Sequence, residues 1–417
     1  MRILILTSIY DFNDKGNLNV DMIDEFARNG HKVTVMTPKE RKYHPDEKKE
    51  NHGNITSFQF KCLNFRGKVN LVEKGISTLS LGYQYKRKWK KYFLNEKYDI
   101  IIYMTLPITY SPILRYLKKK CDPFCYLQQK DFFPQSALDL GILRKNSVLY
   151  KVFRHIEKQL FAESDKIGVL SSKNIDFILD HNPGMNVNKV EVCPNAITPT
   201  SDDILAKIKK NKKIIRSKHD LPTDKVIFLY GGIISRSQGV PFIKEVLSQF
   251  TLNPISNAFI LIIGSGNEYD ELEKHIKLLN NLNIRIMPFM PKKKFDEILG
   301  AADVGMVFLS PKFSIANHPS RSLAHMDMAQ PIVAATDAYT DYKEFLECNE
   351  IGLWCLNGDL DKMMENMRIL TVDTEFRERC GQNSRNYLLN EATASRAYEI
   401  IMNSYEKACK VKHCKGK

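Results

Sequence analysis

The sequence predicts an α/β protein built from two consecutive doubly wound halves. Apolar runs too short for helices alternate with helical patterns, which is typical of buried parallel strands joined by covering helices. The alternation begins at residues 2–9, breaks in the lysine-rich segment 198–224, and begins again at 225–230. A chain of 417 residues also has room for two domains of ordinary size. We therefore expect domains at 1–198 and 225–392, with 199–224 as the linker between them.

The first half opens as a Rossmann-type unit. A strand at 2–9 is followed by a loop that contains Gly16, a helix with apolar residues at helical spacing, and a second strand at 32–36. No G-x-G-x-x-G motif occurs, so a nicotinamide or flavin dinucleotide cofactor loses its main support. We expect no cofactor.

The second half opens with the motif KVIFLYGGIISRSQGV at 225–240. The apolar run indicates a buried strand, and a glycine turn with Gly232 and Gln238 leads into a helix from 240 onward. A strand, a glycine turn and a helix N-terminus form an anion site, because free N–H groups and the helix dipole favour negative charge there. Arg236 adds a guanidinium suited to a diphosphate.

A second polar cluster follows the strand predicted at 303–309. Pro319 and Ser320 suit the first turn of a helix, which would offer N–H groups to a phosphate. Arg321 lies in that turn, and Asp327 could accept hydrogen bonds from a ribose diol. His325 fits a packed position on the helix better than a ligand-binding one.

Two charged residues follow the strand predicted at 123–128 in the first half. Lys130 and Asp131 would lie at the carboxyl end of a parallel strand, where α/β sheets bind ligands. They are candidate site residues, and the competing interpretation is an ion pair within the domain.

The segment 67–93 combines an apolar helical pattern with a basic end. The apolar face would contain Leu71, Val72, Ile76, Leu79 and Tyr83, and the basic end Lys86, Arg87, Lys88, Trp89, Lys90 and Lys91. An anionic membrane surface or a lipid-phosphate acceptor favours such a stretch. A domain helix with a solvated basic end explains it equally well. Nucleic acid is the weakest reading because no binding motif accompanies the patch.

The bulk composition limits the class of protein. The net charge is +14 and the sequence pI about 9.1, which attracts anionic partners without choosing among them. No run approaches the roughly 20 apolar residues that span a bilayer, and the N-terminus resembles a strand more than a signal peptide. The nine cysteines are dispersed and lack zinc spacing. We expect reduced thiols, a cytoplasmic location and no metal site.

Several segments together resemble the retaining GT-B glycosyltransferases of family 4, and most closely the bacterial branch used in capsule and O-antigen assembly. They are NGHKVTVMTP, KDFFPQSALDLG, VCPNAI, YGGIISRSQG, IIGSGNEY, AADVGMVFL, HPSRSLAHMDMAQPIVAATD and NEIGLWCLNGDL. The resemblance implies two facing Rossmann-like domains with a central cleft, metal-independent transfer, and a terminal helix at 393–408 that completes the first domain. It also implies a nucleotide-sugar donor, such as a UDP-sugar, in the second domain.

The resemblance also suggests roles for single residues. Gly232 and Arg236 fall at the diphosphate, Arg321 at the basic residue near the donor, and Asp131 towards the acceptor hydroxyl or the transferred sugar; Gly264 of IIGSGNEY joins the donor group. The acceptor would lie on the first domain, near Gly16.

Some positions depart from the family pattern. The two glutamates that flank the donor in the broad family are Ala316 and Ala324 here, which suggests that ribose recognition has moved to Asp327. Lys130 replaces a frequent histidine, and Gln238 replaces the usual lysine.

The combined reading is a glycosyltransferase held at the inner face of the plasma membrane, with a lipid-diphosphate-linked glycan as acceptor and no nucleic-acid partner. Two other classes remain open. A degenerate, non-catalytic partner of another transferase would explain the two alanines. A nucleotide-sugar 2-epimerase shares the fold and needs no acceptor.

Overall fold

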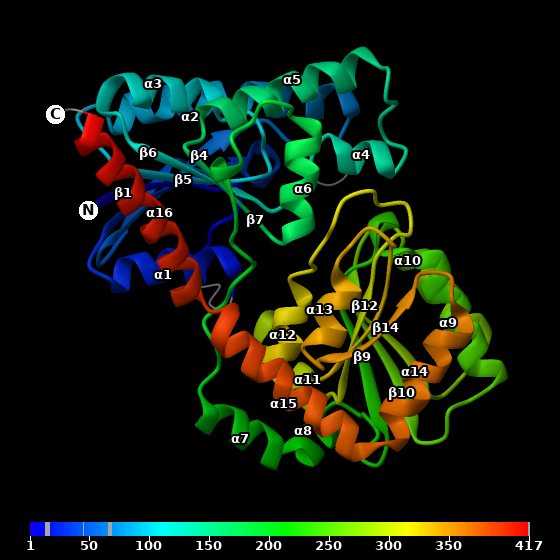
Figure 1. Cartoon of the computed structure of the whole chain (residues 1–417). Coiled ribbons are helices and arrows are strands. Elements are labelled where there is room, and N and C mark those ends of the chain that lie inside the picture. The colour runs from blue at the N-terminus through cyan, green and yellow to red at the C-terminus, as the bar shows by residue number, and fades with distance from the viewer. Residues whose placement is uncertain (13–16, 45, 66–68, 416–417) are drawn as a thin grey trace. The chain divides into compact units, whose positions relative to one another are not determined.

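The chain divides into two units in the computed structural model, which describes residues 1–12, 17–44, 46–65 and 69–415. The first unit contains Met1–Thr198 and Thr393–Lys417, and the second contains Pro199–Ala392. Each unit has its own sheet and covering helices (Figure 1). The predicted α/β class with two halves is confirmed.

The first unit is built on an eight-stranded sheet in the order β3-β4-β2-β1-β5-β6-β7-β8. Every pairing is parallel except that of β3 with β4. The central strands are buried on both faces, which explains their continuous apolar runs. The strands are β1 (Arg2–Leu6), β2 (Lys32–Glu40), β3 (Lys48–His52), β4 (Ile55–Cys62), β5 (Ile100–Met104), β6 (Phe124–Gln129), β7 (Lys166–Val169) and β8 (Val190–Val192).

α-Helices (α) and short 3₁₀-helices (η) cover this sheet, and the last of them is formed by residues after 393. They are α1 (Leu18–Arg28), η1 (Arg41–Tyr43), α2 (Leu71–Tyr92), α3 (Ser111–Cys121), α4 (Gln135–Asp139), α5 (Val148–Glu163), α6 (Ser172–His181), η2 (Val187–Lys189) and α16 (Ala394–Lys415). Helix α16 lies beside α1, where Tyr398 contacts His31 at 3.0 Å (Figure 1). Ile401 is fully buried in the core with Phe26. The terminal helix extends past the predicted end at 408.

The second unit is built on a six-stranded parallel sheet in the order β11-β10-β9-β12-β13-β14. Its strands are β9 (Val226–Ile233), β10 (Ala258–Ser265), β11 (Ile284–Pro288), β12 (Val304–Phe308), β13 (Ile332–Thr336) and β14 (Gly352–Leu356). Its helices are α7 (Asp202–Lys210), α8 (Lys212–Lys218), η3 (Arg236–Gln238), α9 (Val240–Leu252), α10 (Tyr269–Leu279), α11 (Lys292–Ala301), α12 (Arg321–Asp327), α13 (Tyr342–Cys348), α14 (Leu360–Val372) and α15 (Thr374–Glu391).

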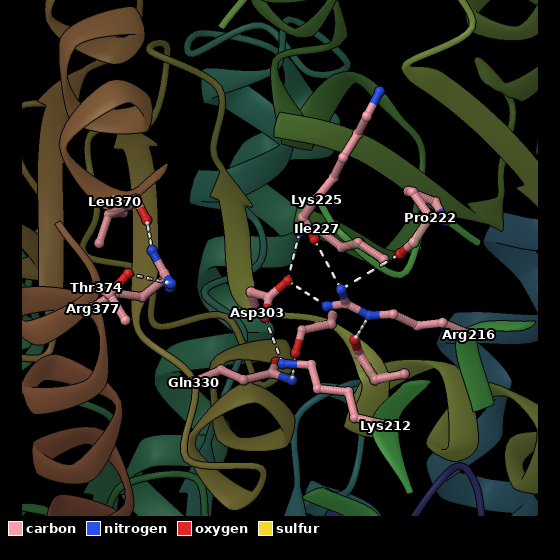
Figure 2. A network of polar contacts seen from close by, with 12 residues as sticks. Lys212, Arg216, Pro222, Lys225, Ile227, Asp303, Gln330, Leu370, Thr374 and Arg377 are labelled. Carbon is pink, nitrogen blue, oxygen red and sulfur yellow. Dashed lines mark hydrogen bonds and ion pairs between the residues drawn. The ribbon is translucent and has the colours of Figure 1, made fainter. Parts of the chain in front are cut away.

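The segment 199–224 differs from the linker that its composition predicts, because α7 and α8 pack on the second unit. Arg216 is 4% exposed and donates to the carbonyl oxygens of Ala301 and Lys225, each at 2.9 Å. It also pairs with the carboxylate of Asp303, which accepts from the amide of Ile227 at 2.7 Å (Figure 2). One buried ion-paired arginine therefore fixes a segment whose other side chains are mostly solvated.

Candidate functional site

The strand order of the second sheet places a topological switch point, where a ligand-binding crevice is expected, at the carboxyl end of β9. Strand β10 lies on one side of β9 and β12 on the other, so the chain leaves β9 towards β10 and leaves β12 in the opposite direction, towards β13. Such a switch point is where open α/β sheets bind ligands. The predicted motif at 225–240 spans β9, η3 and the start of α9.

Glycines shape this edge because backbones approach closely there. A Cβ atom on Gly264 would lie 1.9 Å from the carbonyl oxygen of Gly232, its register partner on β9. Gly239 has φ +62°, and a Cβ atom there would lie 2.7 Å from the side-chain amide of Asn357. Only glycine fits both places, so backbone groups rather than side chains line this part of the crevice.

Arg321 lies against these glycines. Its Nη2 donates to Oε1 of Gln238 at 2.6 Å, and its guanidinium lies over the ring of Tyr230 at 4.7 Å. An added Cβ atom on Gly232 would lie 3.5 Å from the guanidinium carbon. Nη1 is buried and has no hydrogen-bond partner among the described residues. The structure thus brings together Gly232, Gln238, Gly264 and Arg321, and Nη1 of the arginine has no acceptor among the described residues.

Arg236 lies at the open rim of the same crevice. Its side chain is 72% exposed, and Nε is 3.8 Å from the carboxylate of Glu268. Burial raises the pKa of Glu268, and Arg236 partly offsets that rise. The long, weak ion pair leaves the guanidinium able to turn towards a ligand.

Pro319 and Ser320 directly precede α12 instead of forming its first turn, and the helix is short. It contains seven residues, and the Ser320 side chain makes no capping hydrogen bond. A helix of this length has a small dipole, so positive charge at this place comes mainly from Arg321.

Asp327 does not fit the ribose-binding role that the sequence predicts. One carboxylate oxygen accepts from the amide of Thr200 at 2.8 Å and the other from its hydroxyl at 2.6 Å. The carboxylate also pairs with Arg385, which is 3% exposed. Asp327 therefore connects α12 to α15 through Arg385, and to the first residues of the second unit through Thr200.

The remaining predicted positions on α12 are structural. His325 is 1% exposed, its Nδ1 lies 2.8 Å from Oε1 of Gln330, and burial lowers its pKa to about 4. Ala324 packs against an apolar cluster, and Ala316 is buried.

Lys130 and Asp131 lie at the carboxyl end of β6 in the first unit. Their amides both donate to Oγ1 of Thr105 at 3.0 Å, which ties the end of β6 to that of β5. The Asp131 side chain is exposed and the Lys130 side chain is half-buried. Burial lowers the pKa of Lys130 to about 8. The pair occupies the predicted edge of the sheet, and Gly16 lies outside the described residues.

The basic stretch on α2 differs from the predicted surface. Trp89 is 0% exposed and stacks edge-on against Tyr116 at 5.6 Å. Lys88 pairs with Glu47. Lys86 is half-buried over the ring of Tyr116, whereas Arg87, Lys90 and Lys91 are exposed. Trp89 is therefore a core residue and not a membrane anchor.

Sequence reasoning missed three residues at the crevice of the second unit. Tyr230 supports Arg321, Glu268 faces Arg236, and Asn357 donates to the carbonyl oxygen of Leu309 at 2.8 Å. Glu268 follows β10 in a polar turn, a signal that could have identified it. The other two depend on contacts between distant segments.

Two family descriptions match the chain. Glycosyltransferase Family 4 matches residues 16–201, and Glycosyl transferases group 1 matches residues 211–387. Among curated proteins, the chain is 22% identical over 235 residues to the probable glycosyltransferase WbjE of Pseudomonas aeruginosa, covering 55% of each. It is 24% identical over 269 residues to the putative colanic acid biosynthesis glycosyl transferase WcaI of Escherichia coli (strain K12), covering 63% of this chain and 61% of that one. The matches thus span little more than half of these relatives.

Two solved structures share the fold at low identity. The E. coli trehalose-6-phosphate structure bound with UDP-2-fluoro glucose has a TM-score of 0.73 at 13% identity, covering 97% of this chain and 99% of that one. Anabaena Alr3699/HepE in complex with UDP has a TM-score of 0.66 at 13% identity, covering 98% and 100%. The GT-B fold expected from the sequence is confirmed. Residues 16–201 are therefore similar to Glycosyltransferase Family 4 and residues 211–387 to Glycosyl transferases group 1, in that order along the chain.

Proposed function

We propose that the chain is a retaining glycosyltransferase that moves a sugar from a UDP-sugar to a lipid-diphosphate-linked glycan during assembly of a capsule, O-antigen or other exopolysaccharide. The observation that carries the donor part is Arg321, whose buried Nη1 has no hydrogen-bond partner among the described residues and whose guanidinium lies beside Gly232 of β9. A buried, unsatisfied guanidinium N–H is costly unless a ligand accepts from it. A diphosphate supplies such an oxygen.

The same geometry suggests how the transfer step is promoted. Negative charge grows on the diphosphate as the bond to the sugar breaks, and Arg321 and Arg236 would stabilise that charge without a metal ion. Asp131, exposed at the edge of the first sheet, would lie towards the acceptor hydroxyl or the transferred sugar. The structures of other proteins with UDP and a UDP-sugar support a UDP-linked donor.

Thermal-shift binding of UDP, GDP, ADP and CMP tests the donor site. A ligand that binds only the folded state raises its melting temperature. We expect a shift with UDP that is lost in Arg321→Met and reduced in Arg236→Ala, whereas Arg379→Ala, at an exposed arginine of α15, keeps it. No shift with any nucleotide would overturn the proposal in favour of a non-catalytic partner. Release of an epimer from a UDP-sugar without acceptor would indicate an epimerase.

Transfer to a lipid-linked acceptor tests the reaction itself. We expect activity in the presence of EDTA and a product whose anomeric configuration, read by NMR, equals that of the donor. An inverted product would refute the retaining mechanism, and loss of activity with EDTA would refute metal independence.

We further propose that α2 holds the protein at the inner, anionic face of the plasma membrane. Among the residues that the structure describes, no helix has the length and apolar character to cross a bilayer. One line of exposed side chains runs along α2 at helical spacing: Ile76, Leu79 and Tyr83, which are 55%, 39% and 64% exposed, and then Arg87 and Lys90. Apolar groups beside cations favour an anionic lipid surface.

Co-sedimentation with vesicles of phosphatidylglycerol and phosphatidylethanolamine tests the membrane proposal. We expect Ile76→Gln with Leu79→Gln, or Arg87→Gln with Lys90→Gln, to release the protein into the supernatant. Lys292→Gln with Lys293→Gln, which changes two exposed cations of α11, is the matched control. Unchanged sedimentation of both α2 variants would exclude this surface.

A further inference from the structure

Two turns at the rim of the proposed donor crevice are tied to each other through Ile234. Its amide donates to the carbonyl oxygen of Ser265 at 2.9 Å, and its carbonyl oxygen accepts from the amide of Glu268 at 3.3 Å. A Cβ atom on Gly266 would lie 2.0 Å from that carbonyl oxygen, and the Ile234 side chain is fully buried in the core. The turn after β9 and the turn after β10 therefore keep a fixed position relative to each other.

The backbone that carries Arg236 is fixed on its other side as well. The carbonyl oxygen of Ser237 accepts from the amide of Ser310 at 2.9 Å, which ties η3 to the residues that follow β12. The hydroxyl oxygens of Ser235 and Ser237 also lie 2.9 Å apart. Because the backbone is held at both ends, the freedom of Arg236 lies in its side chain, which is 72% exposed.

Glu268 is more enclosed than its arginine partner. The residue directly precedes α10, and its side chain is only 19% exposed. Oε1 lies 3.8 Å from Nε of Arg236, which is too far for a hydrogen bond. Oε2 is buried and has no hydrogen-bond partner among the described residues. A carboxylate in these surroundings keeps much of its negative charge uncompensated.

This carboxylate and the diphosphate of a bound nucleotide would compete for one cation. The ion pair between Arg236 and Glu268 is long and partly solvated, so it contributes little free energy and a ligand can draw the guanidinium away. The carboxylate stays where it is, because the turn that carries it is fixed. Like charges at the edge of a protein repel each other more strongly than in bulk water. Glu268 therefore opposes the binding of anions beside Arg236.

The repulsion acts more strongly on the product of the proposed reaction than on its donor. In a nucleotide-sugar each phosphate of the diphosphate carries one negative charge. When the sugar leaves, its bond to the terminal phosphate oxygen breaks, and that phosphate gains an ionisable group with a second pKa of about 6. At neutral pH the released diphosphate is therefore more negative than the donor, and a carboxylate at the rim disfavours it more.

We propose that Glu268 is a positioning residue that holds Arg236 at the rim before the donor binds and, by repelling the diphosphate product, speeds its release. The inference rests on the proposed function, because it requires a nucleoside diphosphate beside Arg236. It assigns to Glu268 an effect on affinity that is opposite in sign to that of the two arginines of the crevice.

Binding of UDP to Glu268→Gln tests the proposal, with calorimetry for affinity and stopped-flow displacement for the dissociation rate. The amide keeps the shape of the side chain but removes its charge. We expect the dissociation constant of UDP and its dissociation rate both to fall roughly two- to fivefold, the range of a partly exposed ion pair. Unchanged or weaker binding of UDP by Glu268→Gln would overturn the proposal.

A double-mutant cycle tests whether Glu268 acts partly through Arg236. The gain in affinity from Glu268→Gln should be smaller when it is made in Arg236→Ala, because only the repulsion then remains to be removed. An equal gain in both backgrounds would refute the hold on Arg236.

Glu273→Gln is the matched control, since it removes the carboxylate of α10 that pairs with Lys277. It makes the same change in net charge and should leave UDP binding unchanged. An equal gain from Glu273→Gln and Glu268→Gln would indicate a general effect of charge and would overturn the assignment to Glu268.

The pH dependence of UDP binding is a readout that a purely structural role would not change. Burial raises the pKa of Glu268, Arg236 and Lys244 oppose that rise, and Glu271 adds to it. As the pH falls through the raised pKa, the carboxylate takes up a proton and the repulsion is lost. The ratio of the two dissociation constants, wild type over Glu268→Gln, should therefore fall towards one between pH 8 and pH 5. The ionisation of UDP itself cancels in this ratio, and a ratio independent of pH would contradict the proposal.

The same titrations separate this inference from the proposed function. If the wild-type protein binds no UDP, both fall together. If UDP binding depends on Arg321 but is no tighter in Glu268→Gln, the donor site stands and the inference about Glu268 is wrong.

Discussion

Two arginines of the second unit, Arg216 and Arg321, differ in how many of their guanidinium nitrogens have a hydrogen-bond acceptor in the protein. Every guanidinium nitrogen of Arg216 has an acceptor in the protein, and Asp303 neutralises its charge. Arg321 has a single side-chain acceptor, Gln238, and leaves a buried Nη1 without one among the described residues. A satisfied guanidinium stabilises the framework, whereas an unsatisfied one beside glycine backbone is available to a ligand oxyanion.

The largest expected effect is on stability at Arg216. Arg216→Met should lower the free energy of unfolding by about 3–5 kcal/mol, because it leaves Asp303 buried with too little compensating charge. Lys218 lies on α8 like Arg216 and forms an exposed ion pair with Glu297 of α11. Lys218→Met, which breaks that pair, should lower the free energy of unfolding by less than about 1 kcal/mol. Urea denaturation measures both. Equal small losses would mean that α8 is not anchored by this arginine.

Arg321→Met should show the reverse pattern. We expect kcat/KM to fall by about 10²–10³-fold, in line with the loss of a donor aimed at developing charge. The urea midpoint should change little, because the protein satisfies few of this side chain's hydrogen bonds. Arg321→Lys should recover part of the activity, because it restores the positive charge but not the planar pair of guanidinium donors. Full activity in Arg321→Met would remove it from the site.

A fall in pH should weaken the ion pair between Arg216 and Asp303. Burial alone would raise the pKa of Asp303, but Lys212 and Arg216 outweigh it and hold that pKa below its ordinary value. The stabilisation is therefore complete above the unfolded-state pKa of about 3.9 and is lost as the pH falls through the lower folded-state value. Unfolding free energies measured between pH 5 and 2.5 should fall less steeply in Asp303→Asn. An identical slope would assign the acid sensitivity to other groups.

The smallest expected effect concerns Gln238. Gln238→Leu removes the acceptor that orients Arg321 and should weaken UDP binding roughly two- to tenfold. Gln238→Glu should weaken it further, since a carboxylate would pair with the guanidinium and compete with the diphosphate. Calorimetric titration with UDP compares the three proteins. Tighter binding by Gln238→Glu would contradict this account.

The sequence predicted most strands of the two sheets because continuous apolar runs have few other uses, but it did not predict β3, β4 or β14. It misread 199–224, because α7 and α8 are largely polar helices. They are held by Leu205, which packs in an apolar cluster, and by Arg216, whose partner Asp303 is far away in the chain. It also predicted a ribose contact for Asp327, whose partner Arg385 lies in another helix. Local pattern contains no information about such pairs.

Helix α2 shows a second kind of error. Both of its sides contain apolar residues: Leu81, Tyr85 and Trp89 are fully buried, whereas Ile76, Leu79 and Tyr83 are exposed. The periodicity of the sequence identifies two apolar faces of α2 that could be buried. Only packing against the rest of the unit decides which of them is buried. The sequence likewise could not show that Nη1 of Arg321 lacks a partner among the described residues, because a missing partner is a property of the three-dimensional surroundings.

The position of α16 has a consequence for the order in which the protein forms during synthesis. The second unit is continuous from Pro199 to Ala392, whereas the first needs residues from Thr393 onward. A growing chain can therefore complete the second unit while Phe26 of α1 still lacks the helix that covers it. The unit that begins first is therefore completed after the second unit, so nascent chains would expose this apolar face until residues Ala394–Lys415 are made.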